Sequence, residues 1–203
     1  MDVENLTADA DVFTANAYLL RGEHPTMVDV GAMPGVVERI ASRVDRLDRV
    51  VLTHQHGDHV AELDAVVEAF DPTVFAAAET AFDTRLLADG ETIRMGDGSY
   101  EVVATPGHAD DHVSLVGSET LFSGDVVVYN DGAFDDGSFG RTDRPGQSRD
   151  RLIRSVETLL ERLPADVSTM YAGHGDPFEG DVHAVVERAL ERARRREPKY
   201  PDE

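Results

Sequence analysis

The segment at 50–60, V-V-L-T-H-Q-H-G-D-H-V, constrains this chain most, because four candidate metal ligands directly follow an apolar strand. Side chains alternate along an extended backbone, so His54 and His56 point to the same side where the strand ends. Asp58 and His59 follow at the expected start of a helix. Imidazole and carboxylate ligands favour zinc, with iron or manganese as alternatives. A single ion rarely takes four ligands from so short a segment, so the pattern predicts two adjacent metals.

Each of these residues alone also has an ordinary structural interpretation. Asp58 is a suitable cap for the helix that follows, because its carboxylate accepts hydrogen bonds from unpaired N–H groups. A lone histidine is more often a surface residue than a ligand. Three histidines and an aspartate together serve no stabilising purpose that other residues would not serve, so the cluster as a whole predicts metal binding.

Three later segments repeat this arrangement. In each of them a strand-like run ends next to a glycine and a ligand-type side chain. The motifs are T-P-G-H at 105–108, S-G-D at 123–125 and G-H-G at 173–175, which carry His108, Asp125 and His174. Strand ends that converge on one edge are where open-sheet proteins assemble their sites, so these residues are candidates for the same site.

In this order the motifs resemble those of the metallo-β-lactamase fold hydrolases, over a stretch from about Phe13 to His174. The segment G-R-T-D-R-P at 140–145 resembles one that precedes a helix in the small glyoxalase II-like branch of that family. The resemblance implies an α/β fold with four layers, the αββα metallo-β-lactamase sandwich, formed as a single domain over 1–203. The pattern of elements alone indicates only a layered α/β class.

The resemblance further implies a centre of two divalent metal ions, with zinc expected first and iron or manganese as alternatives. The implied ligands are His54, His56 and His108 for one metal, Asp58, His59 and His174 for the other, and Asp125 as the bridge between them. Asp58 is also the candidate catalytic residue, since by analogy it moves protons in addition to binding metal. The chain has no cysteine, so the cysteine-containing second site of many secreted β-lactamases is excluded.

Three other residues are candidates for supporting the site or binding the substrate. Asp29 ends an apolar strand, and in the family such an aspartate supports the metal site through a hydrogen bond; a strand-end turn is the alternative. Arg141 suits a carboxylate bidentately, on the substrate or at the metal site, whereas pairing with Asp143 is its structural alternative. Tyr129 is a candidate for lining the pocket. His112 is expected to support the ligands from behind or to pack near the site, rather than to bind metal.

The pattern along the chain predicts strands that alternate with amphipathic helices. Predicted strands cover 12–20, 26–30, 50–52, 74–76, 91–95, 99–105, 112–124 with a break at 117–118, and 167–172. Predicted helices cover 34–44, 60–70, 79–88, 149–163 and 181–196. The acidic, glycine-rich stretch at 130–140 is a predicted long loop.

Composition limits the partners of the protein. Nineteen basic and forty acidic residues give a net charge of −21 over 203 residues, which argues against nucleic acid and anionic membranes as partners. The acidic surface, with Lys199 as the single lysine, favours a halophilic origin. The N-terminus lacks the features of a signal peptide and no run is long enough to span a membrane, so a cytoplasmic protein is expected. The sequence is compatible with a homo-oligomer.

The function implied is a metal-dependent hydrolase that uses a hydroxide activated by two metals on a small-molecule thioester or related acyl ester. From the short segment after His174, the helical glutathione-binding domain of glyoxalase II itself is not expected. Three alternatives stay open. They are a lactone hydrolase, a persulfide dioxygenase with one iron on a set such as His54, His108 and Asp125, and a non-catalytic metal-binding module.

Overall fold

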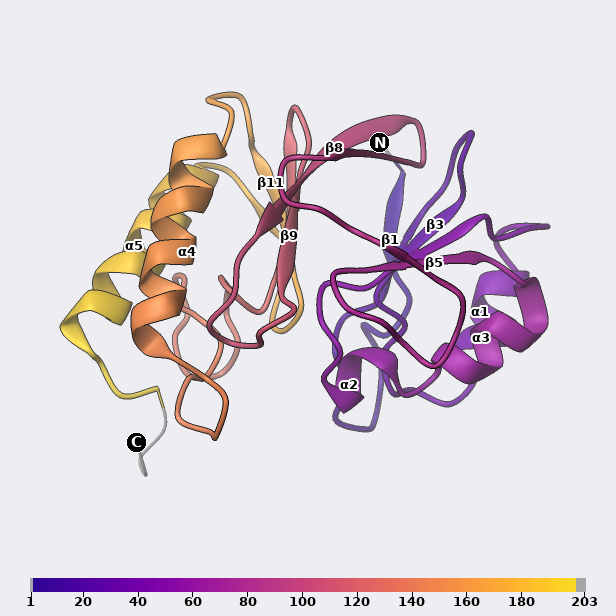
Figure 1. Ribbon diagram of the computed structural model, residues 1–203, viewed down its shortest axis with the longest axis horizontal. Helices are drawn as coiled ribbons and strands as arrows, with labels where there is room; N and C mark the ends of the chain where they lie inside the picture. Colours follow the sequence, from indigo (N-terminus) through magenta and orange to yellow (C-terminus); the bar gives the residue numbers. More distant parts are fainter. Residues whose placement is uncertain (1, 200–203) are drawn as a thin grey trace. The chain divides into compact units, whose positions relative to one another are not determined.

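The computed structural model describes residues 2–199, and its chain divides after Tyr100 into two compact units. The units are described separately below. Each contains strands of a six-stranded mixed sheet together with its own helices (Figure 1). The earlier prediction of one domain over 1–203 stays a prediction. Among the described residues, no helix combines the length and the apolar character needed to cross a bilayer.

The first unit holds a sheet with the strand order β1-β2-β3-β4-β5-β6. Its strands are β1 (Val3–Asn5), β2 (Tyr18–Leu20), β3 (Thr26–Val28), β4 (Arg49–Val51), β5 (Thr73–Ala76) and β6 (Thr84–Leu86). Its helices are α1 (Val36–Ala41), α2 (Gly57–Val60) and α3 (Leu63–Phe70). Strands β1 to β3 pair antiparallel, and β3 to β6 pair parallel. Parallel neighbours require crossover connections, which α1 supplies before β4 and α2 with α3 supplies before β5.

The second sheet has the order β12-β11-β10-β9-β8-β7, and the division between the units falls within β8. Its strands are β7 (Thr92–Met95), β8 (Gly98–Ala104), β9 (Val113–Val116), β10 (Thr120–Gly124), β11 (Thr169–Ala172) and β12 (Phe178–Glu179). The helices α4 (Arg149–Arg162) and α5 (Val182–Arg195) lie side by side in the second unit (Figure 1). Side chains from β10, β11, α4 and α5 share one apolar core.

Most predicted elements are present, with shorter bounds. Of the strand predicted at 12–20, only 18–20 forms a strand, β2. In place of the helix predicted at 60–70 there are two helices, α2 and α3. The short strands β1 and β12 were not predicted. Both long C-terminal helices lie where their amphipathic patterns predicted them, capped by Ser148 and Asp181.

The prediction of a helix at 79–88 is wrong, because this segment forms a turn and then the edge strand β6. The Thr80 and Thr84 hydroxyl groups lie 2.7 Å apart, and the Thr80 hydroxyl oxygen accepts a hydrogen bond from the Phe82 N–H. Such local side-chain bonds compete with helical ones. The turn then allows Thr84–Leu86 to pair in parallel with β5.

Candidate metal centre

The candidate ligands of the first unit follow the carboxyl end of β4. Strand β4 is parallel to β3, with Val51 opposite Val28, so the residues after the two strands meet at one edge of the sheet. The Asp29 N–H donates to the Val51 carbonyl at 3.0 Å, which fixes Asp29 beside the start of the ligand segment. Helix α2 begins at Gly57, with His56 as its N-cap residue, and turns the chain back on itself.

This turn brings the imidazole rings of the first unit together. His54 and His59 are fully buried, and their ring centroids lie 4.0 Å apart. The Nε2 atom of His54 lies 3.0 Å from Nδ1 of His56. The half-buried Asp58 offers a carboxylate oxygen within 4.8 Å of a ring nitrogen of His59. The donor types and their crowding fit a divalent metal that prefers nitrogen and oxygen ligands.

Asp29 orients the imidazole ring of His59 through a hydrogen bond. Its carboxylate is buried and accepts hydrogen bonds from the N–H and the hydroxyl group of Thr53, at 2.8 and 2.7 Å. Oδ2, the oxygen that accepts from the Thr53 hydroxyl, also lies 2.8 Å from Nδ1 of His59. A carboxylate accepts hydrogen bonds, so His59 carries its proton on Nδ1 and keeps Nε2 available as a ligand. Asp29 holds this geometry with a left-handed backbone, φ 56°.

The candidate ligands of the second unit meet beside β10. Strands β10 and β11 are parallel, and the Gly173 N–H donates to the Gly124 carbonyl at 2.8 Å. Asp125 and His174 therefore follow the ends of two neighbouring strands. The Nε2 atom of His174 lies 3.5 Å from Oδ2 of Asp125. His108, in the turn between β8 and β9, places its own Nε2 3.3 Å from the same oxygen. Two imidazoles and a carboxylate therefore converge in this unit.

The loop that contains Gly140 and Arg141 fixes two of these three groups through its backbone. The Gly140 N–H donates to the Asp125 carbonyl at 2.7 Å. The Arg141 carbonyl lies 2.9 Å from Nδ1 of His108 and accepts its hydrogen bond. His108 consequently carries its proton on Nδ1 and presents Nε2 toward Asp125, the arrangement that a metal-binding histidine requires.

The side chain of Arg141 pairs with Asp143 through two hydrogen bonds, at 2.8 and 2.5 Å. This guanidinium holds the pKa of the Asp143 carboxyl at about 2, well below its usual range. This pairing is the one named as the structural alternative for the Arg141 side chain, and a role of Arg141 in substrate binding or site support stays a prediction. Tyr129 packs its ring against Phe178, with centroids 4.7 Å apart.

His112 contacts the site through a hydrogen bond to the backbone of Asp125, the first of the two roles expected for it. Its Nε2 accepts a hydrogen bond from the Asp125 N–H at 2.9 Å, so the proton lies on Nδ1, which is 2.7 Å from the Thr105 hydroxyl group. The chain of hydrogen bonds continues to the Ser114 hydroxyl and the Ser123 carbonyl, at 3.1 and 3.2 Å. The sequence signal was two polar residues, Thr105 directly after β8 and Ser114 within the otherwise apolar β9.

We expect His112→Leu to lower the free energy of unfolding by about 2 kcal/mol, because the buried Asp125 N–H and Thr105 hydroxyl lose their partner. His112→Gln is the matched control, since its side-chain carbonyl still accepts from the Asp125 N–H, and we expect less than half of this loss. Urea unfolding followed by circular dichroism measures both. Equal losses in the two variants would contradict the role of the hydrogen bond.

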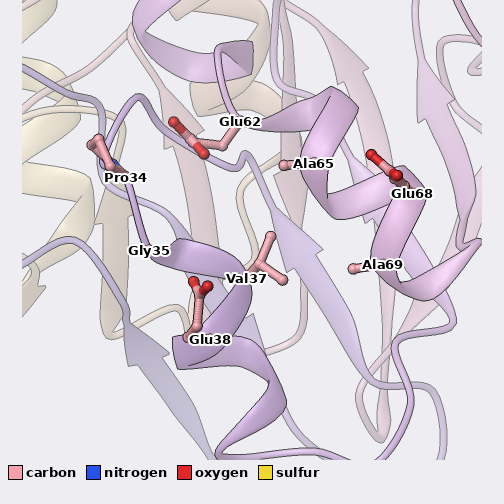
Figure 2. Close-up of a pocket in the computed structure, with 8 residues that line it drawn as sticks. All are labelled: Pro34, Gly35, Val37, Glu38, Glu62, Ala65, Glu68 and Ala69. Atoms are coloured by element: carbon pink, nitrogen blue, oxygen red, sulfur yellow. The ribbon is translucent and has the colours of Figure 1, made fainter.

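A separate groove of about 340 Å³ lies between α1 and α3 in the first unit (Figure 2). Three glutamates border it, and none of the predicted site residues does. The groove is lined by Pro34, Gly35, Val37, Glu38, Glu62, Ala65, Glu68 and Ala69.

Comparison of the sequence with family models identifies residues 10–174 as a match to the metallo-beta-lactamase superfamily. Similar curated proteins include hydroxyacylglutathione hydrolases. The protein from Aliivibrio fischeri strain MJ11 is 32% identical over 107 residues, which cover 51% of this chain and 42% of the relative. The protein from Aeromonas hydrophila is 34% identical over 115 residues, covering 54% and 45%. The chain therefore matches less than half the length of these relatives.

Solved structures show the same fold. ETHE1 from Myxococcus xanthus has a TM-score of 0.75 and 24% identity, covering 100% of this chain and 94% of that one. TTHA1623 in a di-iron-bound form has a TM-score of 0.68 and 25% identity, covering 88% and 98%. The predicted fold class, an α/β arrangement of two mixed sheets flanked by helices, is confirmed. The chain belongs to the metallo-β-lactamase superfamily.

Proposed function

We propose that this protein is a metal-dependent hydrolase that binds two divalent ions, most suitably zinc. The proposed ligands are His54, His56, Asp58 and His59 from the first unit, and His108, Asp125 and His174 from the second. Membership of the superfamily supports this assignment. The observation that carries it is the orientation of His59 and His108, which both present Nε2 because their Nδ1 protons are bound to oxygen acceptors.

The protein groups have distinct proposed tasks. Bound divalent ions supply Lewis acidity, which lowers the pKa of water and polarises the oxygen of a carbonyl group. Asp125 contributes a carboxylate that His108 and His174 both approach. Asp58 is half-buried, and its carboxylate is the proposed acceptor of the proton that the attacking water loses. The chain has no cysteine, so no thiol nucleophile takes part.

A thioester is the proposed substrate class. The curated relatives are named hydroxyacylglutathione hydrolases, and such a substrate has a thiol leaving group. A thiol has a pKa of about 8.5 and leaves as a thiolate without a strong general acid. The three candidate ligands of the second unit are two histidines and one carboxylate, and a thioester does not require any of them to act as a general acid. A lactone is the alternative substrate class, and its alkoxide leaving group must take up a proton that a thiolate does not need.

A second candidate function is oxygenation of a persulfide with one iron. Its proposed ligand set is His54, His108 and Asp125, and the observation that favours it is that Nε2 of His108 lies 3.3 Å from Oδ2 of Asp125 within a single unit. This donor set is the one that non-haem Fe(II) oxygenases use. The additional histidines that surround Asp58 in the first unit favour the hydrolase instead, because a single iron does not need them.

The test is metal analysis of the purified protein in high salt, followed by a panel of thioesters, lactones and phosphodiesters. We expect about two ions per chain and thioester hydrolysis that a chelator abolishes and added zinc restores. The substitutions His54→Ala and His174→Ala should each lower kcat/KM more than about 100-fold, since even outer partners of metal ligands contribute 10- to 100-fold. His183→Ala is the control, because its ring hydrogen-bonds to the Pro164 carbonyl at 3.1 Å and belongs to no candidate ligand group.

Retention of no zinc, iron or manganese would contradict the proposed function. Uptake of oxygen that depends on a persulfide and on iron would replace the hydrolase with the dioxygenase. Cleavage of phosphodiesters alone would leave the metal centre in place and overturn the substrate class.

A further inference from the structure

Lys199, the single lysine of the chain, is buried. Its side chain is 3% exposed, and its ammonium group forms an ion pair with Asp131, whose side chain is 4% exposed. The same Nζ atom donates a hydrogen bond to the Phe139 carbonyl. A buried ammonium group without partners costs several kcal/mol, so both oxygens are needed to hold this side chain in place. Bulk salt screens such a buried pair much less than an exposed one.

The two partners of Lys199 stand at opposite ends of one loop. Asp131 begins the loop, and its other carboxylate oxygen lies 3.4 Å from the N–H groups of Ala133 and Phe134. Phe139 ends the loop. Lys199 therefore closes the loop at 131–139 from the C-terminal segment, as a single cation bound to both ends.

The end of this loop continues directly into the groups that orient two candidate ligands. Gly140 follows Phe139, and its N–H binds the Asp125 carbonyl at 2.7 Å. The carbonyl of the next residue, Arg141, accepts the hydrogen bond from His108. A shift of the Phe139 peptide would displace both contacts, because the three residues are consecutive in the chain.

From this geometry we infer that Lys199 is a positioning residue of the metal centre, acting on Asp125 and His108 through the loop at 131–141. The inference rests on the proposed metal-binding function. Other contacts hold the loop at different points. The Arg149 guanidinium lies 4.1 Å from the Phe139 ring centroid, and Arg188 pairs with Asp136 at 2.8 Å. The Arg188 pair is about half exposed, so it provides a matched control.

The test compares Lys199→Met with Arg188→Gln in the full-length protein. Cobalt(II) is the probe, because its visible spectrum reports the geometry of its ligands and its titration gives an affinity. We expect Lys199→Met to change the cobalt spectrum, to weaken cobalt binding about 10-fold, and to speed proteolytic cleavage within 131–141. Arg188→Gln should keep the wild-type spectrum and affinity. If Lys199→Met does not fold, Asp131→Asn takes its place, because it removes only the negative charge of the pair. We expect Asp131→Asn to change the spectrum, the affinity and the cleavage rate in the same direction.

The outcomes separate the inference from the proposed function. Wild-type protein that binds no cobalt would refute the function and, with it, the inference. Wild-type protein that binds cobalt, together with a Lys199→Met variant of unchanged spectrum and affinity, would overturn the inference and leave the function standing. An equal defect in Arg188→Gln would also overturn it, because any weakening of the loop would then suffice.

Discussion

Gly140→Ala is expected to lower the free energy of unfolding by about 3 kcal/mol, at the upper end of the cost of overpacking. A Cβ atom at this position would lie 2.2 Å from the Asp125 carbonyl oxygen and 2.7 Å from Nδ1 of His108. Neither neighbour is the free end of a flexible side chain, so the backbone must move. The same movement breaks the contacts that orient both candidate ligands. Weaker metal binding, by about 10-fold or more, should accompany the loss of stability.

Gly146→Ala is the matched control for this substitution. Gly146 lies in the loop that continues from Gly140, and a Cβ atom there meets nothing within 4 Å, although its φ is 86°. Left-handed strain alone should cost about 1 kcal/mol. Thermal unfolding should therefore show a decrease in Tm of about 6–12 °C for Gly140→Ala and a much smaller one for Gly146→Ala. Unchanged metal affinity in Gly140→Ala would show that the close approach of the two backbones does not position the ligands.

The sequence predicted well those elements whose pattern is local. The amphipathic repeats of α4 and α5 and their capping residues lie within each helix, so the prediction did not depend on distant contacts. The helix predicted at 79–88 failed for the opposite reason. In this segment the hydrogen bond between Thr80 and Thr84 and the pairing of β6 with β5 stabilise a turn and a strand instead of a helix. The local sequence does not specify β5 as a partner.

The ligand motifs were predictable because each has a side chain at the exit of a strand. His54, Asp125 and His174 follow β4, β10 and β11 within a few residues. The groups that orient the ligands were less predictable. Gly140 and Arg141 act through a backbone N–H and a backbone carbonyl, so no side-chain type marks these two hydrogen bonds. The close approach that requires glycine at 140 joins residues far apart in the chain. The pairing of Lys199 with Asp131 joins residues far apart in the chain, and nothing in either local sequence indicates it.

Asp29→Asn should have the second large effect, acting on the first group of ligands. The carboxylate accepts three hydrogen bonds, two from Thr53 and one from His59. An amide has one oxygen, so its NH₂ group must face one of these donors. The Thr53 N–H can only donate, so the amide oxygen stays opposite it and the NH₂ group takes the place of Oδ2, facing His59 and the Thr53 hydroxyl. The ring proton of His59 then moves from Nδ1 to Nε2, so that Nδ1 accepts from the amide. A protonated Nε2 cannot bind metal.

We therefore expect Asp29→Asn to weaken zinc binding 10- to 100-fold, a loss typical of outer partners of metal ligands. Asp71→Asn is the matched control, since Asp71 has a similar left-handed backbone, φ 48°, but is exposed at the end of α3. Asparagine tolerates this conformation, so any backbone effect is the same at both positions. Zinc titration measures the affinity, and ¹⁵N NMR of the metal-free protein identifies the protonated nitrogen of His59. A His59 ring that keeps its proton on Nδ1 in Asp29→Asn, with zinc bound as tightly as in the wild type, would show that the carboxylate does not select the tautomer.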